Sequence, residues 1–145
     1  MEWIKKEKPQ DLKLLALDIG SKRIGLALWN PAAKMARPLE ARKRKTLKED
    51  LEFFRKITAD NEIQGFLVGI PMSLGGKITE STKNAEFWVE QMKSFSLPVF
   101  TYDESLSTQD AYSILQETTA RKKHKEKKDS IAAALFLEEF IRASD

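Results

Sequence analysis

The sequence predicts an α/β protein in which a mixed β-sheet is covered by helices. Short apolar runs typical of buried strands alternate with longer segments whose apolar residues recur at helical spacing. The first two apolar runs are separated only by residues 18–23, which favours an antiparallel hairpin. The later strands each follow a helix, as in parallel crossover connections. We expect one domain over residues 1–145, with one sizeable core and a loose charged leader at 1–10.

The individual elements follow from these patterns. Apolar runs bounded by turn residues predict strands over 12–17, 24–29, 63–70 and 98–102, with a shorter one between 36 and 41. Helical spacing predicts helices over 47–60, 80–95, 107–118 and 129–142. Two of these helices start with a capping box, formed by Thr46 with Glu49 and by Ser107 with Asp110. Residues 119–128 form a basic loop before the last helix.

The composition excludes several classes of protein. The chain has no cysteine, which excludes a disulfide framework and thiolate metal sites. No apolar run approaches the roughly 20 residues of a transmembrane helix. The charged residues 1–9 lack the apolar segment of a signal peptide. These features predict a cytoplasmic protein without a membrane partner.

Positive charge is concentrated in two clusters, although the net charge is only +3. One cluster is 42–45, and the other is 121–128, with six Lys or Arg residues against one Glu. Such patches on a nearly neutral chain favour a polyanionic partner, above all nucleic acid. The alternative is a pair of solvated loops. The single histidine, His124, lacks the spacing of a metal site, so we interpret it as solvated.

The most informative segment is 14–28, where a predicted buried strand runs into Asp18 and a turn with two glycines. An unpaired buried carboxylate is costly, so Asp18 either caps the turn or holds a positive group. Lys22 and Arg23 in the same turn could attract a phosphate. A carboxylate for a metal ion beside cations for a phosphate is the chemistry of phosphoryl transfer. The alternative is a turn residue satisfied by backbone amides.

Further carboxylates come at the ends of other predicted elements. Asp103 and Glu104 follow the strand 98–102, and Asp129 opens the last helix. Active groups gather beyond the carboxyl ends of parallel strands, so these carboxylates can converge with Asp18. Only one of Asp103 and Glu104 should reach a shared site, because adjacent strand residues point to opposite faces. The alternatives are an N-cap for Asp129 and a solvated strand end for the pair.

Four motifs together resemble the YqgF-type family, which is described as Holliday-junction resolvases or nucleases that trim precursor ribosomal RNA. They occur in the family's order and span about residues 12–142: Asp18-Ile19-Gly20-Ser21-Lys22-Arg23-Ile24-Gly25, Val68-Gly69-Ile70-Pro71, Asp103-Glu104-Ser105-Leu106-Ser107-Thr108 and Lys128-Asp129-Ser130-Ile131-Ala132-Ala133. The resemblance implies a ribonuclease H-like fold. Its sheet would have five strands, of which the second is antiparallel.

The resemblance also implies the residues of the site. The family's catalytic and metal-binding carboxylates correspond to Asp18, Glu104 and Asp129, with Mg²⁺ or Mn²⁺ as the cofactor. Carboxylates are hard oxygen ligands for these ions, which can ionise a water and stabilise a leaving oxygen. Substrate binding is expected from residues of the basic turn, the third motif and the basic loop: Lys22, Arg23, Ser107, Thr108, Lys122, Lys123 and Lys125.

The chain departs from the family pattern at two places. Ser105 stands where the family usually has an arginine after Asp-Glu, and Ser73 and Gly75 replace polar residues of a proline-containing loop. Loss of the arginine removes a bidentate partner for phosphate or carboxylate. The carboxylate trio is retained, so an active nuclease remains the favoured interpretation.

The favoured function is therefore a metal-dependent nuclease acting on structured nucleic acid. Its substrate is either the precursor of the small-subunit ribosomal RNA or branched DNA, and the protein acts as a monomer or a homodimer. One alternative is a nucleic-acid-binding module that has lost catalysis. Another, with less support, is an actin- or sugar-kinase-like phosphotransferase, whose first hairpin also reads Asp-x-Gly. Such folds need two domains to enclose a nucleotide, and 145 residues supply one.

The basic loop gives a first prediction. Replacing Lys122, Lys123, Lys125 and Lys127 with Gln should weaken binding about equally for unrelated sequences, because phosphate contacts carry no sequence information. The slope of the logarithm of the binding constant against the logarithm of the salt concentration should become less steep by roughly 0.7–0.9 for each phosphate that the variant no longer neutralises. Titrations of labelled single-stranded RNA and branched DNA at several salt concentrations measure both effects. An unaltered slope on both substrates would remove this loop from substrate binding.

Overall fold

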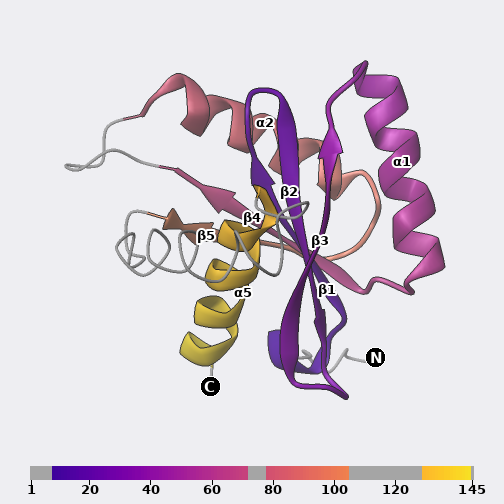
Figure 1. The fold of residues 1–145 in the computed structure, drawn as a ribbon, viewed down its shortest axis with the longest axis vertical. Helices are drawn as coiled ribbons and strands as arrows, with labels where there is room; N and C mark the ends of the chain where they lie inside the picture. Colours follow the sequence, from indigo (N-terminus) through magenta and orange to yellow (C-terminus); the bar gives the residue numbers. More distant parts are fainter. Residues whose placement is uncertain (1–7, 72–77, 105–128, 145) are drawn as a thin grey trace, which may run out of the picture.

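The computed structural model describes residues 8–71, 78–104 and 129–144, which form a five-stranded sheet with helices on both faces (Figure 1). From one edge to the other, the strands are β3 (Met35–Lys43), β2 (Arg23–Asn30), β1 (Leu14–Ile19), β4 (Gly65–Ile70) and β5 (Val99–Asp103). β2 is antiparallel to β1 and β3, whereas β4 and β5 run parallel to β1. The predicted mixed sheet with an antiparallel second strand is confirmed.

Two separate apolar cores bury the two faces of the sheet. α1 (Leu47–Asp60) and α2 (Glu80–Lys93) pack on one face, and α5 (Ile131–Ala143) packs on the other. Along β1, Leu15 and Leu17 belong to the first core, and Leu14 and Ala16 belong to the second. This alternation places Asp18, the next even position, on the face that α5 covers.

Element boundaries differ from the sequence prediction mainly at the polar parts of the chain. β3 has nine residues and extends to Lys43, because it pairs with β2 along almost all of that strand. As an edge strand with many exposed side chains, it lacks the apolar run that marks a buried strand. A short 3₁₀ helix, Pro9–Asp11, precedes β1, and the Trp29 indole donates to the Gln10 carbonyl at 3.0 Å. The predicted helix 107–118 and the basic loop lie outside the described residues.

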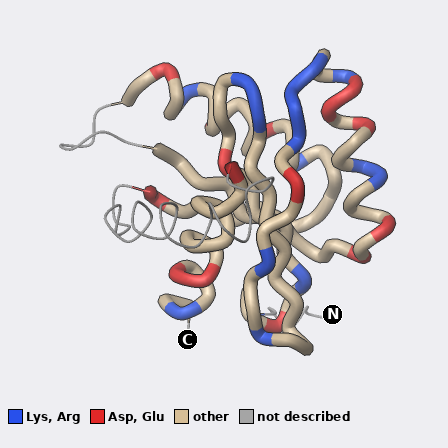
Figure 2. The backbone as a smooth tube through the Cα atoms, in the orientation of Figure 1, with Lys and Arg blue, Asp and Glu red and all other residues tan. Residues whose placement is uncertain are grey.

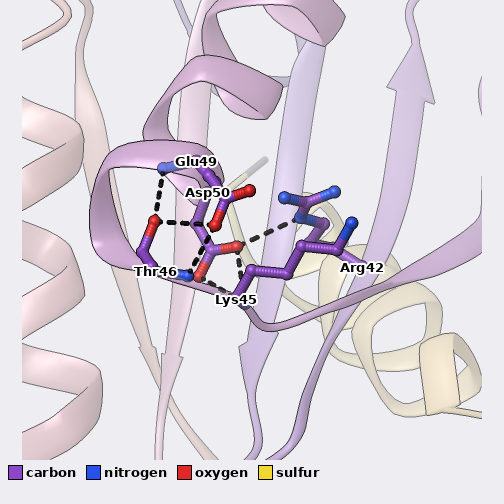
Figure 3. A network of polar contacts seen from close by, with 5 residues as sticks. All are labelled: Arg42, Lys45, Thr46, Glu49 and Asp50. Atoms are coloured by element: carbon purple, nitrogen blue, oxygen red, sulfur yellow. Dashed lines mark hydrogen bonds and ion pairs between the residues drawn. The ribbon is translucent and has the colours of Figure 1, made fainter.

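The N-terminus of α1 is fixed by a polar network that includes two members of the first basic cluster, Arg42 and Lys45 (Figure 3). The predicted capping box is present, since the Glu49 amide donates to the Thr46 hydroxyl and the Thr46 amide donates to the Glu49 carboxylate. Asp50 is buried and accepts hydrogen bonds from the Lys45 amide and, at 3.2 Å, from Arg42 Nε. Arg42 therefore stabilises the junction of β3 and α1.

None of the helices in the described ranges is long and apolar enough to cross a membrane.

The start of α5 lies directly on Gly25 of β2. A Cβ atom at Gly25 would stand 2.0 Å from the backbone oxygen of Asp129 and 3.2 Å from Cα of Ser130. At this point the pairing between β2 and β3 is irregular, and the Leu26 amide donates to the buried Ser130 hydroxyl at 2.9 Å. The absence of a side chain at Gly25 thus allows the chain around Asp129 to pack against the sheet next to Asp18, which pairs with Gly25.

This packing predicts the effect of Gly25→Ala. The added methyl group meets backbone, which cannot rotate away, so we expect a loss of about 1–3 kcal/mol or more in the free energy of unfolding. Gly65→Ala is the matched control in β4, because its added Cβ would first meet the end of the Leu14 side chain at 2.9 Å. Chemical denaturation measures both variants. A loss for Gly25→Ala no larger than that for Gly65→Ala would contradict this account.

Candidate active site

Asp18 is held near the carboxyl end of the central strand, on the face covered by α5. It lies within β1, paired with Gly25, and the strand continues to Ile19, two residues beyond its predicted end. In residues 8–71, 78–104 and 129–144, the structure shows no hydrogen bond to the Asp18 carboxylate. The alternative in which backbone amides of the turn satisfy this carboxylate is therefore not supported.

The environment of Asp18 disfavours its negative charge. Burial, and to a lesser extent the nearby charge of Asp129, raise the pKa of Asp18 from its ordinary 3.8 to about 6. Burial followed by the charges of Asp18 and Asp103 raises the pKa of Glu104 from 4.5 to about 8. Asp18 thus repels two other carboxylates, one on each side of it in the site.

Glu104 comes from the residue immediately after β5. Phe100 and Tyr102 pack in the core beneath α5, so Glu104 continues the series of residues on that face. A Cβ atom at Gly69 of β4 would stand 2.9 Å from Glu104 Oε2, so the glycine leaves room for this carboxylate above the sheet. Of the two adjacent acids, Glu104 is the one whose charge interacts with Asp18.

Asp129 precedes α5 and is not its N-cap. Ser130 occupies the N-cap position, without a side-chain capping bond, so the N-cap interpretation of Asp129 is wrong. The Ser130 hydroxyl instead accepts the hydrogen bond from Leu26 that attaches this turn to β2. Asp129 Oδ2 lies 3.8 Å from Arg23 Nε. Both side chains are about half exposed, so this ion pair contributes little stability and leaves both groups accessible.

The predicted turn and two of the predicted carboxylates line one pocket. Its volume is about 280 Å³, and it is lined by Asp18, Gly20, Ser21, Lys22, Arg23, Gly25 and Asp129. Lys22 and Arg23 are exposed at its rim. Figure 2 shows the basic turn between β1 and β2 beside the basic end of β3. The arrangement combines acidic oxygens on the pocket wall with cations at its edge.

A divalent cation fits the chemistry of these donors. In the part of the chain that the structure describes, no three His, Cys, Asp or Glu side chains form a ready-made metal cluster. Asp18 instead interacts with Glu104 and with Asp129 as two separate pairs. Mg²⁺ usually takes one or two protein carboxylates and completes its shell with water and substrate phosphate. Either pair offers such a carboxylate set, and a cation would offset its repulsion.

The other predicted site residues are Ser107, Thr108, Lys122, Lys123 and Lys125, and all of them lie outside the described residues. The same holds for Ser105 and for His124.

Sequence patterns do not identify the supporting residues of the site. Ser130 and Gly69 both lie in the quoted motifs, but only the packing of α5 and Glu104 shows what they do. Arg44 belongs to the basic cluster 42–45, yet its side chain donates to the Gly20 carbonyl at 2.7 Å. No local pattern predicts a contact between residues that are 24 positions apart.

Comparison with known proteins assigns the family. The sequence pattern of the RuvX family, described as Holliday junction resolvase, matches residues 12–143. The chain belongs to this family. A relative in Koribacter versatilis is 38% identical over 89% of this chain and 86% of its own length, and one in Thermoanaerobacter pseudethanolicus is 32% identical over 90% and 96%. Both are named as candidate pre-16S rRNA nucleases.

Solved structures of two resolvases share the fold of this RuvX-family chain. RuvC of T. thermophilus, in complex with a Holliday junction substrate, has a TM-score of 0.56 at 14% identity, covering 91% of this chain and 95% of RuvC. The fowlpox virus resolvase, in complex with Holliday junction DNA, has a TM-score of 0.56 at 12% identity, covering 91% and 98%. The predicted ribonuclease H-like fold is confirmed, since these neighbours are resolvases of that fold.

The raised pKa of Asp18 predicts how Asp18→Asn changes stability with pH. In metal-free protein, the raised pKa of Asp18 stabilises the folded state. This stabilisation has its full size below about pH 3.9, the pKa of Asp in the unfolded chain. It is lost as the pH rises through about 6, the pKa in the folded protein. The stability of the Asn variant relative to the parent should therefore rise between about pH 4 and 8. A rise in pKa from 3.8 to about 6 corresponds to a difference of about 3 kcal/mol.

Urea denaturation with a chelator at several pH values measures this difference. Asp60→Asn is the control, because Asp60 is exposed on α1 and pairs with Lys56, four residues earlier on the same helix. A difference between the Asp18→Asn variant and the parent that does not change with pH would contradict the assigned environment of Asp18.

Proposed function

We propose that this chain is a nuclease that hydrolyses phosphodiester bonds in structured nucleic acid with the help of Mg²⁺ or Mn²⁺. The main support is the placement of Asp18, whose buried charge is opposed by both Glu104 and Asp129 in a site with a cationic rim. Asp18 and Glu104 are partly buried and Asp129 is exposed, and like charges held so close together are unfavourable for folding, which favours a role in which a cation is bound. Membership of a family described as resolvases supports the same reaction class.

In this proposal the three carboxylates hold the metal. Asp18 is the central ligand, because it is the one carboxylate that interacts with both of the others. Glu104 and Asp129 approach it from β5 and from the start of α5. When bound, the ion supplies Lewis acidity, which activates a water and stabilises the leaving oxygen.

Lys22 and Arg23 bind the phosphates of the substrate in this scheme. Both side chains are exposed on the turn that follows Asp18, and both line the same pocket as Asp18 and Asp129. Arg23 also contacts Asp129 at 3.8 Å, so a phosphate at the rim would compete for its guanidinium group. Their charges hold the backbone without reading sequence, which suits recognition of a nucleic acid by shape.

Two substrates are consistent with this site. The names of the relatives favour the precursor of 16S rRNA, and the family description favours a four-way DNA junction. A junction requires two cuts, which a homodimer would supply, whereas trimming of an RNA end needs one active site. A cytoplasmic location is part of this proposal, because a nucleic-acid substrate of either kind is found inside the cell.

A binding module without catalysis is the second candidate, and one observation favours it. Ser105 replaces the arginine that usually follows Asp-Glu in the family. The replacement removes, next to Glu104 in the sequence, a guanidinium group that could donate two hydrogen bonds to a phosphate. The nuclease is favoured because Asp18, Glu104 and Asp129 are retained and the first two lie in an environment that disfavours their charge. The phosphotransferase alternative loses support, since the family match covers residues 12–143.

Asp18→Asn tests the nuclease proposal. The substitution keeps the volume of the side chain and removes a ligand charge, so cleavage of labelled precursor rRNA fragments and four-way junctions should fall at least about a hundredfold. Asp60→Asn removes an equivalent charge from the exposed face of α1 and should leave the rate unchanged. The parent should lose activity in a chelator and regain it with Mg²⁺ or Mn²⁺.

Two outcomes would contradict the proposal. Equal cleavage by the Asp18→Asn variant and the parent would remove Asp18 from the site. Binding of either substrate without metal-dependent cleavage by the parent would instead establish the binding module.

A further inference from the structure

Arg44, the residue after β3, holds the turn between β1 and β2 at two points. Its Nη1 atom donates to the Gly20 carbonyl at 2.7 Å, and its backbone amide donates to the Lys22 carbonyl at 2.9 Å. The turn itself is closed by a bond from the Gly20 amide to the Arg23 carbonyl at 2.9 Å. Three hydrogen bonds therefore fix the backbone of a segment whose tip, Ser21 to Arg23, is exposed to solvent.

The other side of the Arg44 guanidinium group is anchored to the core. Its central carbon lies 5.9 Å from the centre of the Trp88 ring, and Trp88 is 1% exposed in the core between the sheet and α2. A charge-assisted bond to a carbonyl together with a cation–π contact restrains the guanidinium plane. Arg44 thus connects the turn to Trp88 of α2, in the same core that Ile19 and Ile24 enter from the strands on either side of the turn.

Arg44 and Arg42 are separated by one residue but have different surroundings. Arg42 donates to the buried Asp50 of α1 (Figure 3). It also lies 4.6 Å from the centre of the Phe53 ring on the same helix. Arg44 reaches the turn, whose residues line the pocket with Asp18 and Asp129. Within the described residues, two of the four charges of the cluster 42–45 are therefore engaged, Arg42 at α1 and Arg44 at the turn that lines the pocket.

We propose that Arg44 is a positioning residue that fixes the Gly20–Lys22 backbone and so places Lys22 and Arg23 for substrate phosphates. The inference rests on the proposed function for the role of those two cations. Long exposed side chains lose less entropy on binding when their backbone is already ordered. Arg44 acts through the turn rather than by contacting the phosphate, which separates this role from that of a basic patch.

Amide hydrogen exchange in the free protein tests the positioning directly. In Arg44→Gln and Arg44→Lys, the Gly20 amide should exchange about tenfold faster or more, because opening of the turn no longer breaks the guanidinium bond. Lysine keeps the charge but lacks the planar guanidinium group, so Arg44→Lys should not restore slow exchange of the Gly20 amide. The controls are Arg42→Gln, which removes an arginine from the α1 contact, and Lys43→Gln, which removes an exposed charge. Neither should change Gly20 exchange.

The kinetic test asks whether Arg44 acts through Lys22 and Arg23. Both Arg44 variants should lower kcat/KM for cleavage about tenfold, whereas Arg37→Gln, which removes an exposed arginine of β3 outside the cluster 42–45, should change it little. In a background carrying Lys22→Gln and Arg23→Gln, the further loss caused by Arg44→Gln should be much smaller.

Two results would overturn this role for Arg44. One is unchanged Gly20 exchange in Arg44→Gln, and the other is full retention of kcat/KM by Arg44→Lys, which would mean that only the charge matters. If the parent protein cleaves neither substrate, the proposed function fails, while the exchange experiment still decides whether Arg44 fixes the turn.

Discussion

The close contact between the start of α5 and Gly25 determines the geometry of the site. Because Gly25 has no side chain, the backbone around Asp129 packs against β2, and the Ser130 hydroxyl accepts the Leu26 amide at the irregular pairing with β3. Asp18 is the partner of Gly25 in β1. One backbone contact therefore brings a carboxylate from residue 129 beside a carboxylate from residue 18, although 110 residues separate them in the sequence.

The energetic consequence of this packing is an unfavourable cluster of acids. Asp18 is largely buried, and its charge interacts unfavourably with Asp129 and with Glu104, whose position over the sheet depends on Gly69. The surrounding fold is stabilised elsewhere, by the two apolar cores and by polar junctions such as Arg42 with Asp50. In the proposed function a divalent cation relieves this repulsion. The ionised carboxylates that would bind the metal are therefore also the state of the site that is least favourable without it.

The sequence predicts the features that depend on local pattern. Leu14 to Leu17 and the run at 65–70 are apolar enough to identify strands, and Thr46 with Glu49 identifies the start of α1. Asp18, Glu104 and Asp129 could be proposed because they follow such elements and match family motifs. The length of β3 could not be predicted, because this exposed edge strand carries polar side chains and lacks a continuous apolar run.

The contacts of Arg44 and Ser130 depend on packing between distant elements, so neither residue differs by itself from an ordinary surface Arg or helix-cap Ser. The proposed mechanism requires that the carboxylates around Asp18 form a divalent-metal site. Soaking crystals of the parent and of the Asp18→Asn variant in Mn²⁺ and measuring anomalous scattering tests it most directly. We expect an anomalous peak at the Asp18 carboxylate of the parent, shared with Glu104 or Asp129, and no such peak in the variant. Peaks found only away from Asp18, or a peak of equal strength in the variant, would contradict it.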